Sequence, residues 1–169
     1  MQAPFLEHPC YADAAIFTKA VRMALKFGEF YGDDNDGSLA AQALDAAETR
    51  ISELASEGTP SWSRTSGLVV RGYVSPLDGS PQPYGLEIPA VAVADGAADA
   101  PLFVWLHGRG DTNTDLASIM GWSSKSAFPD STYPTEKGVL VMHAFGMKSI
   151  SFSTKSMISA LFWTKVGPF

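Results

Sequence analysis

The chain has 169 residues, of which 46% are hydrophobic and 18% charged, and its formal net charge at pH 7 is −6. This composition is enough for an apolar core and excludes a disordered chain. The acidic balance argues against a nucleic-acid partner, because nucleic-acid binding requires a basic face. The single cysteine, Cys10, excludes an internal disulfide framework and a cysteine-rich zinc site.

The first nine residues include Glu7 and two prolines but no basic segment followed by a long apolar run, so they do not resemble a signal peptide. No stretch of the sequence reaches the roughly 20 apolar residues of a membrane-spanning helix. We therefore expect no membrane partner. The sequence as it starts at Met1 predicts a cytoplasmic protein, and a start further upstream would allow a secreted or periplasmic one.

Two amphipathic helices are predicted at the N-terminal end, each with apolar residues at steps of three and four. The stripe of the first, residues 11–31, is Phe17, Ala20, Val21, Ala24, Phe27 and Tyr31. The polar run 32–37 should end it, and Ser38 should cap a second helix at about residues 39–57. The second stripe is Ala40, Leu44, Ala47, Ile51 and Leu54, and Gly58 and Pro60 follow it. The short connection predicts an antiparallel helical hairpin.

The pattern changes to β-structure after residue 65. Residues 68–73 and 83–89, on either side of a turn at 78–80, predict a β-hairpin. Residues 101–106 and 138–145 are continuous apolar runs, which are typical of strands buried on both faces. A surface loop at 91–100 and a short helix at 114–120 are predicted between these strands. We expect an α/β fold with a helical hairpin at 1–65, a sheet domain at 66–146 and an atypical tail at 147–169.

The segment Leu106-His107-Gly108-Arg109-Gly110-Asp111 carries the most specific chemical signal. It follows a buried strand and precedes a helix, which is where acyl-transfer hydrolases place backbone N–H groups that stabilise an oxyanion. The N–H groups of Gly108 and Arg109 are the candidate donors, and His107 is expected to hold the loop rather than act as a base. The same residues also suit an ordinary glycine-rich turn in any α/β protein.

Residues 67–120, from Gly-Leu-Val-Val-Arg-Gly-Tyr-Val to Val-Trp-Leu-His-Gly-Arg-Gly-Asp, resemble bacterial serine peptidases of the prolyl-oligopeptidase family and related esterases. The similarity extends over about residues 11–146. It implies the first half of an α/β-hydrolase sheet, formed by the β-hairpin and two central parallel strands. It also implies Ser-His-Asp chemistry on an ester or peptide substrate, with no cofactor.

The sequence departs from that family's pattern where the nucleophile should follow. It contains no Gly-x-Ser-x-Gly, and the nearest match, Gly121-Trp122-Ser123-Ser124-Lys125, lacks the second glycine. No Asp and His pair follows a plausible serine, and the histidines are His8, His107 and His143. The tail from Met147 contains no acidic residue. We interpret the chain as a front portion, inactive alone, that ends or changes frame before the nucleophile, and whose open sheet edge favours self-association.

The remaining candidates are weaker. Trp122 is the best candidate for a wall of a substrate cleft, whereas Trp105 is expected in the core. The acidic run 32–37 lacks the spacing of a calcium loop, and Arg109-Gly110-Asp111 is expected to fix the loop rather than mediate adhesion. No metal site is predicted. The alternative function is a non-catalytic binding or accessory module built on the helical hairpin and the β-hairpin.

Overall fold

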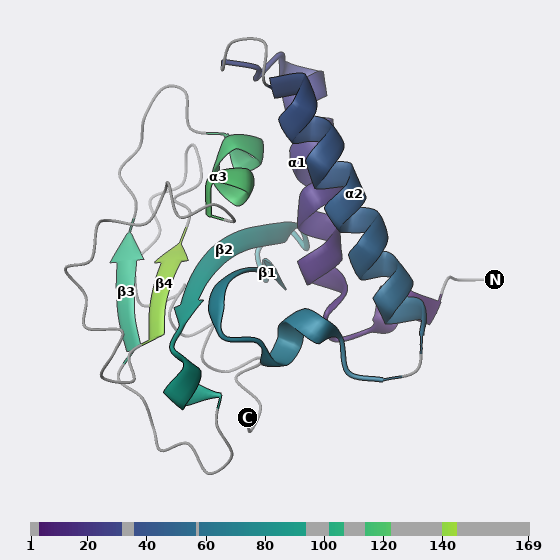
Figure 1. Cartoon of the computed structure of the whole chain (residues 1–169). Coiled ribbons are helices and arrows are strands. Elements are labelled where there is room, and N and C mark those ends of the chain that lie inside the picture. Colours follow the sequence, from purple (N-terminus) through teal and green to yellow (C-terminus); the bar gives the residue numbers. More distant parts are fainter. Residues whose placement is uncertain are drawn as a thin grey trace.

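The structure is a computed structural model, and it describes residues 4–31, 36–56, 58–93, 102–106, 114–122 and 140–144. It confirms a mixed α/β class, with a helical pair beside a sheet (Figure 1). In chain order the elements are η1 (Pro4–Glu7), α1 (Tyr11–Phe27), α2 (Asp36–Ala55), η2 (Ser61–Arg64), β1 (Gly67–Val74), β2 (Pro81–Ile88), η3 (Ala90–Ala92), β3 (Leu102–Leu106), α3 (Asp115–Trp122) and β4 (Leu140–Ala144). Among the described residues, no helix is both long and apolar enough to cross a membrane.

Helix α1 ends earlier than its apolar stripe predicts. Gly28 adopts a left-handed conformation with φ of 63°, and its N–H donates to the carbonyl oxygen of Ala24. This C-cap stops the helix at Phe27, so the predicted extension to residue 31 is wrong. Phe27 and Tyr31 are 55% and 51% exposed, so the last part of the predicted stripe does not reach the core.

Helix α2 packs against α1 through small side chains. Ala43 and Ala47 are almost fully buried, which allows the two helices to approach closely, and Leu54 is buried further along. Leu44 was expected on the buried face but is 47% exposed, because the interface is centred on its neighbour Ala43. Ser38 does not cap the helix. It lies inside the first turns, where its hydroxyl accepts a hydrogen bond from Gln42 Nε2 at 3.1 Å.

The described strands form one four-stranded sheet in the order β1-β2-β4-β3. β1 and β2 are an antiparallel hairpin, from Gly67 opposite Ile88 to Val74 opposite Pro81. β2 is also antiparallel to β4, whereas β3 and β4 pair in parallel. Within this sheet β4 is internal and β3 lies at an edge. The connection from β3 to its parallel neighbour contains α3, as parallel pairing requires a crossover.

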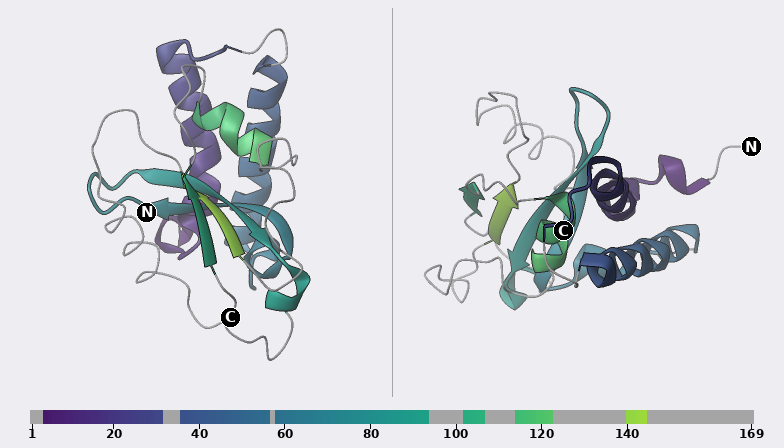
Figure 2. Two further views of the ribbon diagram at one scale, coloured as in Figure 1. Left: turned by 90° about the vertical axis from the view of Figure 1, so that its left-hand side faces the viewer. Right: turned by 90° about the horizontal axis from the view of Figure 1, so that it is seen from above.

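The three helices lie on the same side of the sheet (Figure 2), and they share one core with it. This core crosses the domain boundary predicted at 65–66, because α1 and α2 lie before it and β1 and α3 after it. Its buried members are Ile16, Phe17, Ala20, Val21, Ala24, Ala43, Ala47, Val70, Leu116, Ile119 and Trp122. A second cluster fills the region beside η2 and η3 with Ala14, Leu54, Trp62, Val69, Ile88 and Ala92.

The closest approach of α1 to the sheet is at Gly72 of β1. A Cβ atom added to Gly72 would lie 2.6 Å from the carbonyl carbon of Ala12 and 2.9 Å from Cγ2 of Ile16. The first of these is backbone and cannot move aside alone. Glycine is therefore required here by the contact between helix and strand rather than by a turn.

We predict that Gly72→Ala lowers the free energy of unfolding by about 2–4 kcal/mol, because the added methyl group must displace α1 from β1. Urea denaturation measures the change. The control is Gly37→Ala in α2, where an added Cβ meets nothing within 4 Å. The control should be neutral or slightly stabilising, by up to about 1 kcal/mol. Equal stability of Gly72→Ala and the parent protein would contradict the close approach.

Candidate functional site

The predicted oxyanion-hole residues His107, Gly108 and Arg109 lie outside the described residues, as does Asp111. The elements on either side of them are described. β3 ends at Leu106, which pairs with Ala144 of β4, and α3 begins at Asp115. The expected order of strand, glycine-containing segment and helix is therefore present, and the role of the loop itself stays a prediction.

The N-terminal end of α3 is held by two polar interactions. Thr114 caps the helix, because its hydroxyl accepts a hydrogen bond from the N–H of Ala117 at 3.0 Å and its carbonyl oxygen accepts one from Ser118 at 3.1 Å. Asp115 is the first residue of the helix, where a carboxylate is favoured by the helix dipole. Asp115 itself is not the cap. Its Oδ2 lies 2.9 Å from Nζ of Lys19 in α1.

Trp122, the predicted cleft wall, is 1% exposed and belongs to the core. Its indole lies over Gly85 of β2, where an added Cβ would be only 3.0 Å from Cδ2 of the ring. The indole thus anchors the C-terminal end of α3 to the sheet. Its binding role stays a prediction, and the packing of the described residues gives it no support. Trp62 is also buried, at 7% exposed.

Asp13 of α1 is a buried carboxylate that sequence reasoning missed. It is 1% exposed, and three donors from two other elements converge on it. Oδ1 accepts the backbone N–H of Gly72 at 2.6 Å, and Oδ2 accepts Nε of Arg71 at 3.0 Å and Nε1 of Trp62 at 3.1 Å. The interaction with Arg71 is also an ion pair. One side chain therefore joins α1, η2 and β1.

The bond to Gly72 lies at the edge that β1 forms among the described strands. Gly72 lies opposite Pro83, which has no N–H to exchange across the strand pair. The N–H of Gly72 instead points away from β2 and is taken by Asp13. Unpaired groups of an edge strand invite pairing with another chain, and the Asp13 carboxylate takes one of these groups out of reach.

Arg50 of α2 completes the network from the other helix. Its Nη1 donates to the backbone carbonyl oxygen of Asp13 at 2.7 Å. Its guanidinium lies between two aromatic rings, 4.8 Å from the centre of Phe17 and 4.9 Å from that of Trp62. Stacking of this kind suits a planar, weakly hydrated cation. Arg50 thus connects α2 to the same residue that connects α1 to the sheet.

Burial shifts the pKa values of the groups around Asp13. It lowers the pKa of Arg50 to about 10, although Asp13 acts in the opposite direction. Burial also acts to lower the pKa of Arg71, but the charge and hydrogen bond of Asp13, together with Tyr84 and Cys10, act in the opposite direction and the pKa is raised. On β2, opposite Arg71, burial raises the pKa of Tyr84 to about 12. Near neutral pH both guanidinium groups are charged and the Tyr84 phenol is neutral.

The Asp13 network is suited to holding the fold rather than to chemistry. Both carboxylate oxygens are engaged by donors, and each donor belongs to a different residue. A general base needs an oxygen that can reach a substrate proton, and a 1% exposed side chain offers no such approach. We therefore interpret Asp13 as the structural centre of the described part of the chain.

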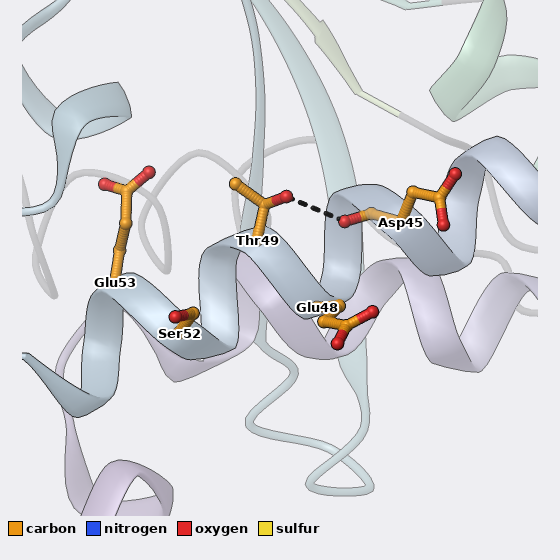
Figure 3. A pocket seen from close by; sticks show the side chains of 5 residues that line it. All are labelled: Asp45, Glu48, Thr49, Ser52 and Glu53. Carbon is orange, nitrogen blue, oxygen red and sulfur yellow. Dashed lines mark hydrogen bonds between the residues drawn. The ribbon is translucent and has the colours of Figure 1, made fainter.

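A shallow hollow lies on the solvent side of α2 (Figure 3). It is lined by Asp45, Glu48, Thr49, Ser52 and Glu53, which all belong to this one helix. The hydroxyl of Thr49 is bonded to the backbone of Asp45, and Glu53 accepts from both the N–H and the hydroxyl of Ser61. These side chains form a solvated helix face. The part of the chain that the structure describes contains no group of acidic, histidine or cysteine side chains that could hold a metal ion.

Comparisons with family models, with curated proteins and with solved structures found no match to this chain. The resemblance to prolyl-oligopeptidase-type hydrolases therefore stays a prediction from the sequence.

We predict that Asp13→Asn lowers the free energy of unfolding by about 3–5 kcal/mol, because it leaves a largely buried guanidinium without its counterion. The amide also cannot accept all three hydrogen bonds with the same geometry. The matched control is Asp45→Asn on the exposed face of α2, which should change stability by less than about 0.5 kcal/mol. Chemical denaturation measures both variants. Equal effects of the two substitutions would contradict the central place of Asp13.

Proposed function

We propose that this chain is the front portion of an α/β-hydrolase-type serine hydrolase, a peptidase or esterase, and that it contributes the oxyanion-hole loop. The observation that supports this most is the unit formed by β3, α3 and β4. Its two strands pair in parallel, and the His107-Gly108-Arg109 segment follows β3 and precedes α3 in the sequence. In α/β-hydrolases the loop between the third strand and the next helix supplies one oxyanion-hole N–H.

The order of the strands also supports the proposal. The hairpin comes first in the sheet, and β2 is antiparallel to both of its neighbours. β4 then lies between β2 and β3. This arrangement is compatible with the first half of an α/β-hydrolase sheet. β3 and β4 lie within the apolar runs at 101–106 and 138–145 that were predicted to be strands.

The proposed chemistry of the loop follows from its backbone. In acyl transfer, the carbonyl oxygen of an ester or amide becomes negatively charged as the tetrahedral intermediate forms. The N–H groups of Gly108 and Arg109 would donate to that oxygen, and the glycines would let the substrate approach the backbone closely. His107 would hold the loop in place. A serine nucleophile and its base would complete the site.

The nucleophile is proposed to come from sequence other than these 169 residues, since they contain no Gly-x-Ser-x-Gly. A fluorophosphonate probe should therefore leave the purified chain unlabelled, whereas an active serine hydrolase assayed beside it is labelled. Mass spectrometry of the treated chain checks the result. Labelling of Ser123 or of any other serine would contradict the missing nucleophile.

The nucleotide sequence beyond codon 146 provides a second test of the same proposal. We expect one of its three reading frames to encode Gly-x-Ser-x-Gly, followed by an acidic residue and a histidine. No such run in any frame would contradict the proposed family.

The alternative, an independent accessory module, is not favoured by the packing of the helical pair. Asp13 of α1 accepts a hydrogen bond from the backbone of β1, and core residues of α1 and α2 pack against Val70 and α3. We predict that a fragment of residues 1–66 is largely unfolded, because it exposes this apolar face and leaves Asp13 without Arg71. Far-UV circular dichroism tests the fragment. A cooperative unfolding transition would instead support the module.

A further inference from the structure

The helical pair has a side that faces away from the core. Two residues along a helix correspond to about 200° around it. On α1, Ala20 is buried in the core, so Arg22 points away from the core and is exposed. On α2, Ala46 packs against the same core, so Leu44 points away from it and is 47% exposed. The core side of the pair is the one that carries the sheet and α3 (Figure 2).

The outward stripe of α1 is cationic around a leucine. Leu25 and Lys26 follow Arg22 at three and four residues, which places the three side chains on one face of the helix. All three are exposed, Leu25 at 67%. Residues 14–27 of this helix contain no acidic residue, so its outward surface has one sign of charge.

The outward stripe of α2 is anionic around a leucine. Asp45 and Glu48 lie one and four residues after Leu44, and both are exposed (Figure 3). Arg50 is the basic residue of this helix, and it donates to the backbone of Asp13 rather than to this stripe. The two stripes together are named the outer helical face, which consists of Arg22, Leu25, Lys26, Leu44, Asp45 and Glu48.

The two stripes are matched in level along the pair. The helices run antiparallel (Figure 1), and Arg50 of α2 lies over the ring of Phe17 in α1. Five residues further along α1 and five residues back along α2, Arg22 is level with Asp45. A two-fold axis parallel to the helices keeps each residue at its level and places α1 of one copy on α2 of the other.

We propose that the outer helical face binds the same face of a second copy of this chain, with α1 of each protomer on α2 of its partner. The basic stripe of each copy then meets the acidic stripe of the other, at two equivalent contacts. Leu25 and Leu44 fill the centre and the charges surround them, which is the usual anatomy of a protein interface. The proposal does not depend on the hydrolase chemistry.

Charge complementarity selects both the occupant and the arrangement. Among the described residues, none of the four charges of the face has an ion-pair partner. Packing α1 on α1 would bring Arg22 and Lys26 against their own copies, and like charges in contact cost affinity. The net charge of −6 acts against association, but charges more than about 8 Å apart are largely screened at physiological salt, whereas the stripes are in contact.

Sedimentation equilibrium of the full chain over a range of concentrations tests the proposal. The parent chain should show a monomer–dimer equilibrium that added salt weakens. Arg22→Glu with Lys26→Glu makes both stripes acidic, and Asp45→Lys with Glu48→Lys makes both basic. Each double variant should raise the dimer Kd at least about tenfold, because like charges meet at both contacts. An equimolar mixture of the two variants should restore the parent Kd, because an acidic face then meets a basic one.

Matched controls lie outside the outer helical face. Leu25→Ser should raise the Kd about tenfold, since the dimer buries this leucine twice. Leu77→Ser, in the turn of the β-hairpin where Leu77 is 62% exposed, should leave the Kd unchanged. Arg64→Glu reverses an exposed cation away from the face and should also leave it unchanged. Urea midpoints of all variants show that each chain is folded.

Three results would overturn the proposal. The first is a parent chain that stays monomeric at every concentration. The second is a dimer that persists in both double variants, because it would form through another surface such as a sheet edge. The third is a mixture of two folded double variants that stays monomeric, because the pairing of α1 with α2 requires the mixture to associate.

Discussion

The described fold depends on one buried carboxylate. Asp13 lies in the first turn of α1, and it binds the guanidinium of Arg71, the indole of Trp62 and the backbone of Gly72. Burying a charge is costly unless donors satisfy it, and here three donors do so. Arg50 joins α2 to these elements by donating a hydrogen bond to the backbone carbonyl oxygen of Asp13. The helical pair, η2 and the edge of the sheet are therefore joined at a single point.

This junction also holds the elements that pack against α3. Among the described strands the sheet has its edges at β1, where Asp13 binds the N–H of Gly72, and at β3. The loop proposed to carry the oxyanion donors leaves the end of that same strand. The helices that Asp13 holds against the sheet also provide the core for α3 and, through Lys19, the bridge to its first turn. Helix α3, which follows the proposed loop in the sequence, thus packs against an N-terminal region that the sequence suggested could be separate.

Elements with strong periodicity were predictable from the sequence, whereas the polar network was not. The β-hairpin at 68–73 and 83–89 agrees with β1 and β2, and the apolar runs at 101–106 and 138–145 agree with β3 and β4. The predicted end of α1 was wrong because Gly28 adopts a left-handed conformation that stops the helix, although the apolar stripe continues past it. A signal for Asp13 was present, since it lies four residues before Phe17 on the buried stripe. Arg50 likewise lies on the stripe of Ala43, Ala47 and Leu54. The spacing of apolar residues cannot predict the partners of Asp13, because Arg71 and Trp62 come from distant segments of the chain.

The exchange rate of the Gly72 amide proton tests the junction most directly. Gly72 is on an edge strand, opposite a proline, and its N–H points away from β2. If Asp13 binds it in solution, the proton should exchange only on global unfolding, as slowly as protons inside the sheet. Exchange at the rate of an open strand edge, many times faster than global unfolding permits, would show that Asp13 does not hold α1 against β1.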